Sequence, residues 1–319
     1  MVAGTLTSGG RSFERSPLSR LPDRALRWTL TGLAAAILVL IAYFFIRLYD
    51  EAQPVFTKYG VFDFVFSNAW VPSQGQFGAL PLVVGTLVTS ALALLIGVPV
   101  AVASALYVTE LAPRRVRQPL IILVELLAAV PSVVYGLWGV FVLIPKLKPV
   151  EQWISDTFGF LPFVGGDVAG PNYFIAGLIL AIMILPIVSA ISREVIATVP
   201  VEHKEAALAL GATRWEMIRM AILPYARAGI SGAAMLGLGR AIGETIAATL
   251  VIGNAPEIAH SIFGQGYTLA AVIANEFGEA ASDETHRAAL IAAGLVLFVL
   301  TLFVNFLARY FVLRSERTR

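Results

Sequence analysis

Long apolar stretches alternate with shorter polar ones along most of the chain. Each of six apolar stretches has more than twenty residues, enough for a helix to cross about 30 Å of hydrocarbon at about 1.5 Å per residue. These stretches are residues 28–49, 81–109, 118–145, 172–192, 229–252 and 287–312. The pattern predicts an all-α integral membrane protein with six transmembrane helices and with both termini on one side of the membrane.

Prolines lie within three of the apolar stretches, and polar segments separate or precede them. Pro99, Pro131 and Pro186 are expected to interrupt the second, third and fourth helices, as neighbouring helices in a membrane allow. Residues 1–27 are predicted to be a basic tail and residues 50–79 an aromatic-rich connector. A basic segment ahead of an apolar one also fits a signal peptide. No small-x-small cleavage site follows residue 49, so the first stretch is predicted to remain as a transmembrane helix.

Composition supports a membrane protein and excludes several kinds of site. Of the 319 residues, 58% are hydrophobic and 14% are charged, and the mean hydropathy is +0.80. Soluble domains carry about 25% charged residues. The chain has no cysteine, which excludes disulfides and thiolate metal sites. His203, His260 and His286 are far apart in the sequence and suggest no shared metal site.

The distribution of lysine and arginine predicts the orientation. The tail, the 110–117 turn, residues 193–228 and the C-terminal end from residue 309 hold seventeen basic residues, whereas the opposite side and its helix ends hold five. Loops rich in Lys and Arg stay in the cytoplasm. Both termini and residues 193–228 are therefore predicted to be cytoplasmic.

Residues 202–224 form the longest polar segment between two apolar stretches, and we refer to them as the docking segment. Good helix formers at residues 205–210 predict one short helix, which Gly211 ends with a left-handed residue. Thr213 and Glu216 have capping-box spacing and predict the start of a second helix. Leu223-Pro224 is expected to end that helix. A short helical pair of this kind suits docking to a partner protein.

A DNA-reading helix-turn-helix is the competing interpretation of the docking segment. Ala207, Gly211 and Met217 fit its loose spacing. That fold needs a third helix to bury its core. The chain instead returns to an apolar stretch within a few residues, so no nucleic-acid partner is predicted.

The fifth apolar stretch contains two charged residues, Arg240 and Glu244. A central arginine costs about +2.5 to +3.5 kcal/mol on translocon scales, so intramembrane charges usually face a pathway or a partner. The i, i+4 spacing predicts that both lie on one helix face, where Glu244 could orient the Arg240 guanidinium toward an oxyanion. An internal ion pair with a packing role is the alternative. Glycines crowd this helix, including Gly239-x3-Gly243, and predict close packing against a second subunit or a neighbouring span.

Glu125 is a further acidic residue within an apolar stretch. It could snorkel or pair with Arg114, Arg115 or Arg117, or lie near the pathway. Together with Arg240 and Glu244 it gives one positive and two negative charges. An oxyanion substrate would therefore require positive charge from a second subunit.

The docking segment resembles the EAA loop of binding-protein-dependent ABC importer permeases, Glu-Ala-Ala-x3-Gly-x9-Ile-x-Leu-Pro. The matching residues are Glu205, Ala206, Ala207, Gly211, Leu223 and Pro224, while Ala221 replaces the isoleucine. The resemblance implies a type I ABC importer permease fold, with a permease domain at residues 80–312, a coupling loop at residues 193–228 and a cytoplasmic tail at residues 313–319. It also implies that a coupling helix docks in a cleft of an ATPase subunit.

Two further stretches resemble phosphate-specific ABC permeases of the PstC type: residues 129–139, AVPSVVYGLWG, and residues 240–245, RAIGET, with the ending LVIGN at residues 250–254. The resemblance implies a multi-pass permease of the plasma membrane and a heterodimer with a PstA-type subunit. It further implies two PstB-type ATPases and a PstS-type phosphate-binding protein as partners. Arg240 and Glu244 would then be needed for translocation, and Glu125 stays a further candidate for the pathway.

Energy must come from such a partner, because the sequence has no P-loop and the dipeptide Gly-Lys never occurs. No cofactor is expected on this chain, and ATP would be used by the ATPase. The acidic loop 253–286 is expected to repel free phosphate, and its predicted helix at residues 268–277 could dock the binding protein. An ordinary solvated loop is the alternative. Sulfate or molybdate transport and secondary transport are the alternatives. No catalytic constellation indicates an enzyme.

Overall fold

The structure, a computed structural model, describes the backbone of residues 21–317 and the side chains of residues 24–310. The chain divides into two compact units, residues 1–50 and residues 51–319, and each is described by itself. Residues 1–20 and 318–319 of the predicted tails lie outside the described residues, whereas residues 21–27 and 313–317 continue α1 and α13.

The described part of the chain is helical, with only isolated β-bridges beside the helices. The elements are α1 (Leu21–Tyr59), α2 (Val61–Phe66), η2 (Pro72–Gln74), α3 (Leu80–Leu106), η3 (Tyr107–Leu111), α4 (Arg114–Ala129), α5 (Ser132–Trp138), η4 (Gly139–Leu143), α6 (Ile144–Phe158), α7 (Tyr173–Ala197), α8 (Val201–Ala209), α9 (Arg214–Met217), η5 (Ile218–Ile222), α10 (Leu223–Ile242), α11 (Ile246–Val251), α12 (Leu269–Glu276), η6 (Glu279–Ser282) and α13 (Glu284–Arg317). The elements η3, η4 and η5 are π-helical turns.

Six helical segments among the described residues are long and apolar enough to cross a membrane, which confirms the predicted all-α architecture. They are Arg24–Tyr59, Leu80–Leu111, Ser132–Phe158, Tyr173–Ala197, Arg214–Ile242 and Glu284–Tyr310. The first is longer than the predicted 28–49, because the polar residues at both ends continue the helix. The side of the membrane on which each end lies stays a prediction.

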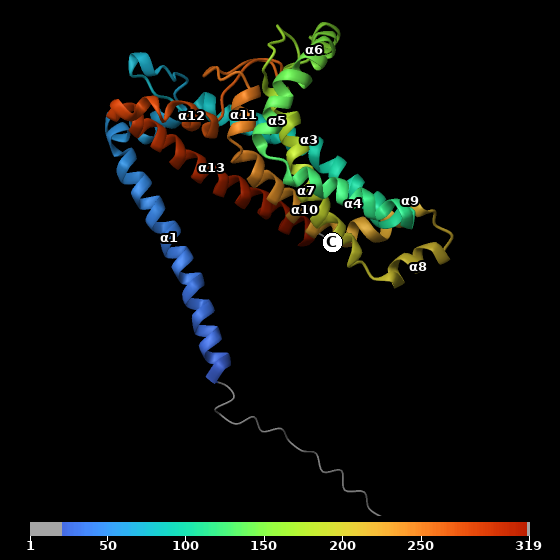
Figure 1. Ribbon diagram of the computed structural model, residues 1–319. Coiled ribbons are helices and arrows are strands. Elements are labelled where there is room, and N and C mark those ends of the chain that lie inside the picture. Colours follow the sequence, from blue (N-terminus) through green and yellow to red (C-terminus); the bar gives the residue numbers. More distant parts are fainter. Residues whose placement is uncertain (1–20, 318–319) are drawn as a thin grey trace, which may run out of the picture. The chain divides into compact units, whose positions relative to one another are not determined.

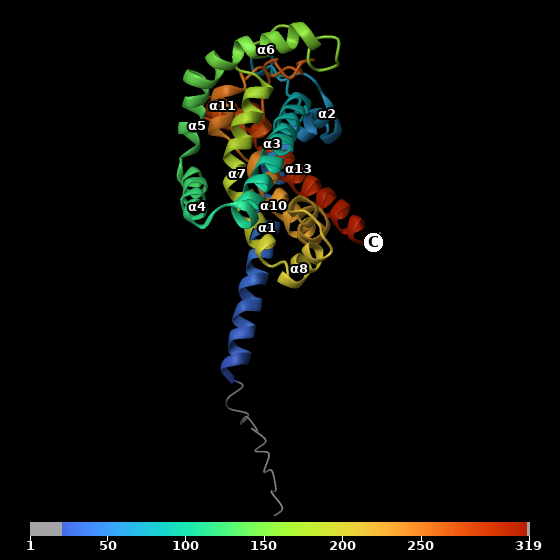
Figure 2. The same cartoon turned by 90° about the vertical axis from the view of Figure 1, so that its right-hand side faces the viewer.

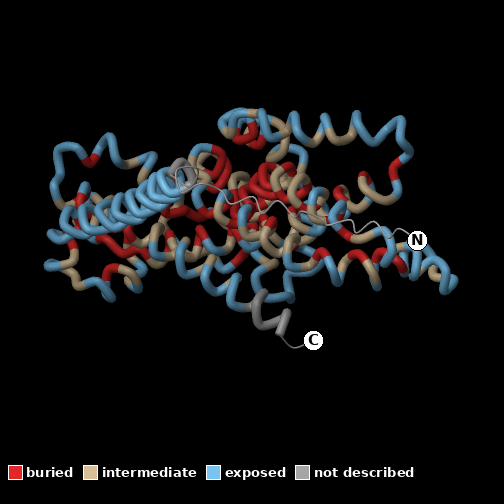
Figure 3. Tube along the Cα trace, turned by 90° about the horizontal axis from the view of Figure 1, so that it is seen from below, coloured by how far each residue is buried: buried red, intermediate tan, exposed pale blue. Residues whose placement is uncertain are grey.

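Helix α7 is the centre of the second unit, and α3 and α10 pack on it (Figure 1). Its inward side chains, among them Ile179, Ile184 and Val188, are buried, and the buried positions gather in the middle of the unit (Figure 3). Asn172 begins the helix: its Oδ1 accepts a hydrogen bond from the Ile175 N–H at 2.8 Å. The Asn172 amide Nδ2 also donates to Oε2 of the buried Glu151 in α6 at 3.1 Å.

The prediction that three prolines interrupt the spans was right only for Pro131. Pro99 and Pro186 lie inside the continuous helices α3 and α7. At Pro131 the chain breaks between α4 and α5, because the preceding Val130 is extended, as the residue before proline prefers. The predicted third span, residues 118–145, is therefore not one helix. Figure 2 shows α4 and α5 in sequence, with α6 across the end of the unit opposite α8.

The fifth span also differs from the prediction of one helix over residues 229–252. It begins at Arg214, runs through η5 and α10, and stops at Ile242. Residues 243–245 interrupt it before the short helix α11. Arg240 lies in α10 ahead of the interruption, whereas Glu244 lies within it.

At the end of the unit opposite α8, the connector packs on α12 and the start of α13. Phe64, Trp70 and Phe77 form an aromatic core there, with edge-on ring contacts between consecutive members. The helix predicted at residues 268–277 is confirmed as α12, and the Thr268 hydroxyl caps it by accepting from the Ala271 N–H at 3.1 Å. The connector is thus an ordered part of the second unit from residue 51 onward.

Candidate functional site

The docking segment folds as its sequence predicts at its centre. Helix α8 ends before Gly211, whose φ of 84° is left-handed and favours glycine. Thr213 and Glu216 form both halves of a capping box: the Thr213 hydroxyl accepts from the Glu216 N–H, and the Glu216 carboxylate accepts from the Thr213 N–H at 2.8 Å. The turn between the two helices is therefore fixed by local hydrogen bonds.

The predicted end of the second helix at Leu223-Pro224 was wrong. Pro224 lies in the first turn of α10, directly after the π-helical turn η5, and the helix continues through it. Proline is tolerated in the first turn of a helical segment, where a backbone donor is missing without cost to the rest of the helix. The docking segment is thus joined rigidly to the helix that carries Arg240.

A small apolar core lies beneath the docking segment. Met217, Ile218 and Ile222 pack on Ala105 of α3 and Ile196 of α7. Helix α8 itself has no buried residue. Its Lys204 reaches the same region with its ammonium group, which donates to Oε1 of Glu110 in η3 at 2.6 Å.

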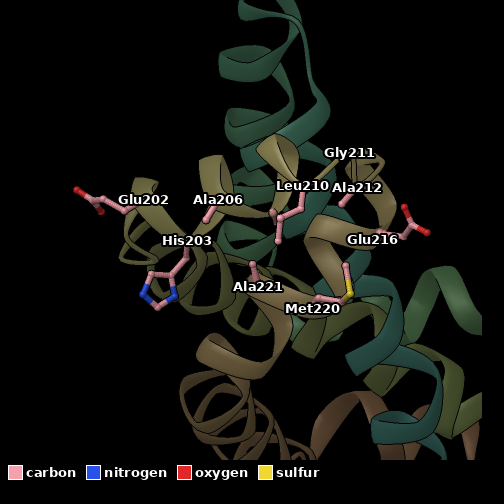
Figure 4. A pocket seen from close by; sticks show the side chains of 10 residues that line it. Glu202, His203, Ala206, Leu210, Gly211, Ala212, Glu216, Met220 and Ala221 are labelled. Carbon is pink, nitrogen blue, oxygen red and sulfur yellow. The ribbon is translucent and has the colours of Figure 1, made fainter.

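A hollow of about 700 Å³ opens between α8 and the helix that follows it (Figure 4). Its lining is largely apolar, with Ala206, Leu210, Met220 and Ala221 around it. Leu210 is 90% exposed and Met220 60% exposed. Exposed apolar side chains around a concave surface mark a protein interaction site.

The six residues of the EAA-like motif occupy different parts of this site. Ala206, Ala207 and Gly211 line the hollow, whereas Glu205 is exposed on α8 outside the lining. Leu223 packs against the apolar core beneath the segment, and Pro224 is exposed. The motif thus supplies the wall, the turn and the anchoring of the segment.

Arg240 lies near the end of α10 and is exposed. No hydrogen bond or ion pair joins Arg240 to another side chain among the described residues. Leu236 and Gly243 are exposed on the same face of this helix end. The guanidinium therefore stays available on an open face of the unit.

The prediction that Glu244 shares a helix face with Arg240 was wrong. Gly243 ends α10, so Glu244 lies in the interruption rather than one helical turn further on. The Glu244 Oε1 accepts a hydrogen bond from the Ala247 N–H at 3.3 Å and thereby caps α11. Neither an ion pair nor the orienting contact that we expected joins Glu244 to Arg240 in the described structure.

The glycines of α10 serve two purposes, which the sequence alone left open. A Cβ at Gly229 would lie 2.5 Å from Val195, and one at Gly237 would lie 2.8 Å from Val188, both in α7. These glycines permit close packing within the chain. Gly232 and Gly239 have no other atom within 4 Å of such a Cβ and so face open space.

Glu125 of α4 pairs with a residue that the sequence analysis did not consider. Its Oε1 accepts from Nη2 of Arg193 in α7 at 2.9 Å. Pairing with Arg114, Arg115 or Arg117, which was one of the alternatives, does not occur in the described structure. Glu125 and Arg193 are 68 positions apart, and only the packing of α4 on α7 brings them together.

In the acidic loop, residues 253–286, the Glu276 carboxylate forms contacts within the chain. The Glu276 carboxylate accepts from Trp70 Nε1 at 3.0 Å and lies 2.9 Å from His286 Nε2. Burial raises the pKa of nearby Tyr267 to about 12, and its hydroxyl accepts from the Asn275 amide. Glu276 thus joins α12 to the connector and to α13, and it is not part of an open acidic mouth.

Sequence reasoning missed Lys204, Glu110 and Arg193 as residues of these sites. Each is joined to its partner by tertiary packing, and an isolated Lys or Glu near a helix end gives no local signal. Within residues 24–310 no group of three or more His, Asp or Glu side chains is placed to hold a metal ion.

Residues 93–317 match a protein family described as the binding-protein-dependent transport system inner membrane component. The chain belongs to this family. A permease of Mesorhizobium japonicum named phosphate transport system permease protein PstC is 44% identical to it over 301 residues, which are 93% of this chain and 91% of the relative. The protein of the same name from Xylella fastidiosa is 41% identical over 318 residues, 98% of this chain and 96% of the relative. The resemblance to PstC-type permeases is thereby confirmed, and the chain is a transport permease subunit rather than an enzyme.

A solved structure of a bacterial alginate ABC transporter, in complex with an alginate pentasaccharide-bound periplasmic protein, matches the permease with a TM-score of 0.59. The match covers 92% of this chain and 98% of that chain at 20% identity. At this identity the likeness establishes the fold, which is that of an ABC importer permease. The permease is therefore a multi-pass membrane protein of a family that works with an ATPase and a binding protein.

Proposed function

We propose that this permease forms half of the translocation pathway of an ATP-driven phosphate importer. The observation that carries the proposal is Arg240, a guanidinium with no partner in the described chain on the open face of α10. The relatives named as phosphate transport permeases support phosphate as the substrate. A guanidinium offers the bidentate donors that suit a phosphate oxyanion.

The partners are proposed from the resemblance to PstC-type permeases and from the charge balance. A PstA-type permease completes the pathway and supplies the further positive charge. One of two PstB-type ATPases docks at the docking segment in the cytoplasm and the other docks on the PstA-type subunit. A PstS-type phosphate-binding protein docks at the opposite side, at α12. The permease lies in the plasma membrane with both termini in the cytoplasm. It binds no cofactor of its own, and ATP is hydrolysed by the ATPase subunits.

Glu244 and Glu125 stay predictions as pathway residues. Both carboxylates are engaged within the chain, Glu244 by the α11 backbone and Glu125 by Arg193. Their contribution would be to position the elements around Arg240. Sulfate and molybdate stay as alternative substrates, and the family match leaves secondary transport without support.

The test is ATP-dependent uptake of labelled phosphate by the complete transporter in proteoliposomes, with sulfate and molybdate as competitors. We expect Arg240→Gln to lower uptake by about 10-fold or more, because a charge-assisted contact of about 1.5–3 kcal/mol is lost. Arg309→Gln, at an exposed position near the end of α13, is the matched control and should transport normally. Equal uptake by Arg240→Gln and the wild type, or competition by sulfate as strong as by phosphate, would contradict the proposal.

A further inference from the structure

One ion pair ties the docking segment to the transmembrane helix α3. Lys204 Nζ of α8 lies 2.6 Å from Glu110 Oε1 of η3, and their side chains are only 18% and 11% exposed. No other side chain of α8 forms an ion pair in the described structure. The two residues are 94 positions apart in the sequence, so the contact joins two separate parts of the chain.

The surroundings make this pair costly to open. Both charges are largely removed from water, and the apolar core that includes Ala105, Leu106 and Ile196 lies at the same end of α3 and α7. Leaving one of these charges without its partner destabilises the folded protein more than leaving an exposed charge unpaired would. The pair therefore holds α8 at a fixed distance from the end of α3.

The docking segment is thus linked to α10 by the continuous chain and to the α3 span by the ion pair. Through η5 it continues as α10, the helix that carries Arg240. Through Lys204 it is attached to η3, the π-helical last turn of α3. Such π-helical turns occur frequently at functional sites. A displacement of α8 would reach α10 along the chain. It would reach α3 directly through the ion pair, and indirectly through the apolar core that Met217 and Ile218 share with Ala105.

We propose that the Lys204–Glu110 ion pair is a positioning contact that transmits movement of the docking segment to α3 and so couples ATP hydrolysis to transport. This inference rests on the proposed function. Neither residue touches phosphate or ATP. Their part is to make α3 and α10 move together when the ATPase partner displaces α8.

The experiment uses the complete transporter in proteoliposomes and measures ATP hydrolysis and phosphate uptake in one preparation. The variants are Lys204→Gln, Glu110→Gln and the exchanged pair Lys204→Glu/Glu110→Lys. Glu194→Gln is the control, because Glu194 is an exposed carboxylate near the end of α7 with no ion pair in the described structure. The amount of assembled complex is determined for each variant.

Each single variant should assemble and should lower the ratio of phosphate uptake to ATP hydrolysis by about five-fold or more, the usual lower range of coupling between sites. The exchanged pair should recover most of that ratio, and the control should keep it. The inference is overturned if the single variants keep the wild-type ratio, if they fail to assemble, or if the exchange recovers nothing. A wild-type transporter that takes up no phosphate would instead overturn the proposed function.

Discussion

At the scale of single residues, Glu244 shows how one backbone interruption changes the role of a charge. Its spacing from Arg240 suggests an ion pair only if the helix continues, and Gly243 ends it. The carboxylate instead accepts from the Ala247 N–H and caps α11. A cap needs an acceptor oxygen, whereas a counter-ion needs a negative charge, so the two roles respond differently to substitution.

Glu244→Gln keeps an acceptor oxygen and removes the charge, whereas Glu244→Ala removes both. We expect phosphate uptake by the Gln variant to stay within about two-fold of the wild type, and uptake by the Ala variant to fall about five-fold, since a lost cap costs about 1 kcal/mol. Uptake in proteoliposomes, normalised to the amount of assembled complex, gives the comparison. A Gln variant as impaired as the Ala variant would show that the charge matters and that the cap does not.

Local hydrogen bonds were predictable at this scale, and contacts between distant residues were not. The Thr213–Glu216 capping box is predicted because the two residues are three positions apart, and the structure contains it. The Glu125–Arg193 pair depends on how α4 packs against α7, which no local pattern encodes. The pathway candidate Arg240 was found because a charge inside an apolar stretch is itself a signal.

At the scale of elements, the prolines explain why spans were predictable and their interruptions were not. Pro99 and Pro131 give the same signal in an apolar stretch. Around Pro99, the residues Ala93, Gly97 and Ala101 of α3 are buried, and this packing keeps the helix continuous despite the lost hydrogen bond. Helix α4, ahead of Pro131, has no buried residue and yet continues through Pro119, so burial alone does not decide which proline ends a helix.

The turn of the docking segment is an element whose conformation can be tested. Gly211 is left-handed, and a Cβ there would have no neighbour within 4 Å, so substitution acts through the backbone alone. Asn tolerates this conformation, whereas a β-branched residue does so poorly, and the ordinary cost is about 1–2 kcal/mol. We expect near-normal phosphate uptake by Gly211→Asn and uptake lowered several-fold by Gly211→Val, with equal amounts of both proteins in the membrane.

Gly211→Pro should be more severe than Gly211→Val. Proline fixes φ near −65°, and it also removes the N–H that Gly211 donates to the Leu208 carbonyl at 3.0 Å. Uptake should be abolished while the chain is still inserted. If Val and Pro at this position transported as well as Asn, the left-handed turn would not be required for coupling.

At the scale of the whole molecule, the two sets of glycines on α10 distinguish internal packing from assembly. Gly229 and Gly237 face α7 within the chain, whereas Gly232 and Gly239 face open space. The open face also presents Leu236 and Arg240, an apolar residue and an unpaired cation. A surface of that kind within the membrane is suited to close approach by the second permease subunit, which would also bring the missing positive charge to the pathway.

Gly229→Leu and Gly232→Leu are therefore a matched pair, since both change one glycine in the same helix three residues apart. Leucine at Gly229 must displace Val195, because its Cβ would lie 2.5 Å from that side chain, and overpacking costs about 1–3 kcal/mol. We expect this variant to lower the thermal stability of the isolated permease. A Cβ at Gly232 would have no neighbour within 4 Å, so the isolated Leu variant should be about as stable as the wild type. It should instead lose the second permease subunit during purification in mild detergent. Retention of that subunit by Gly232→Leu would place the interface on another face of the permease. The pathway around Arg240 would then need a different source for the missing positive charge.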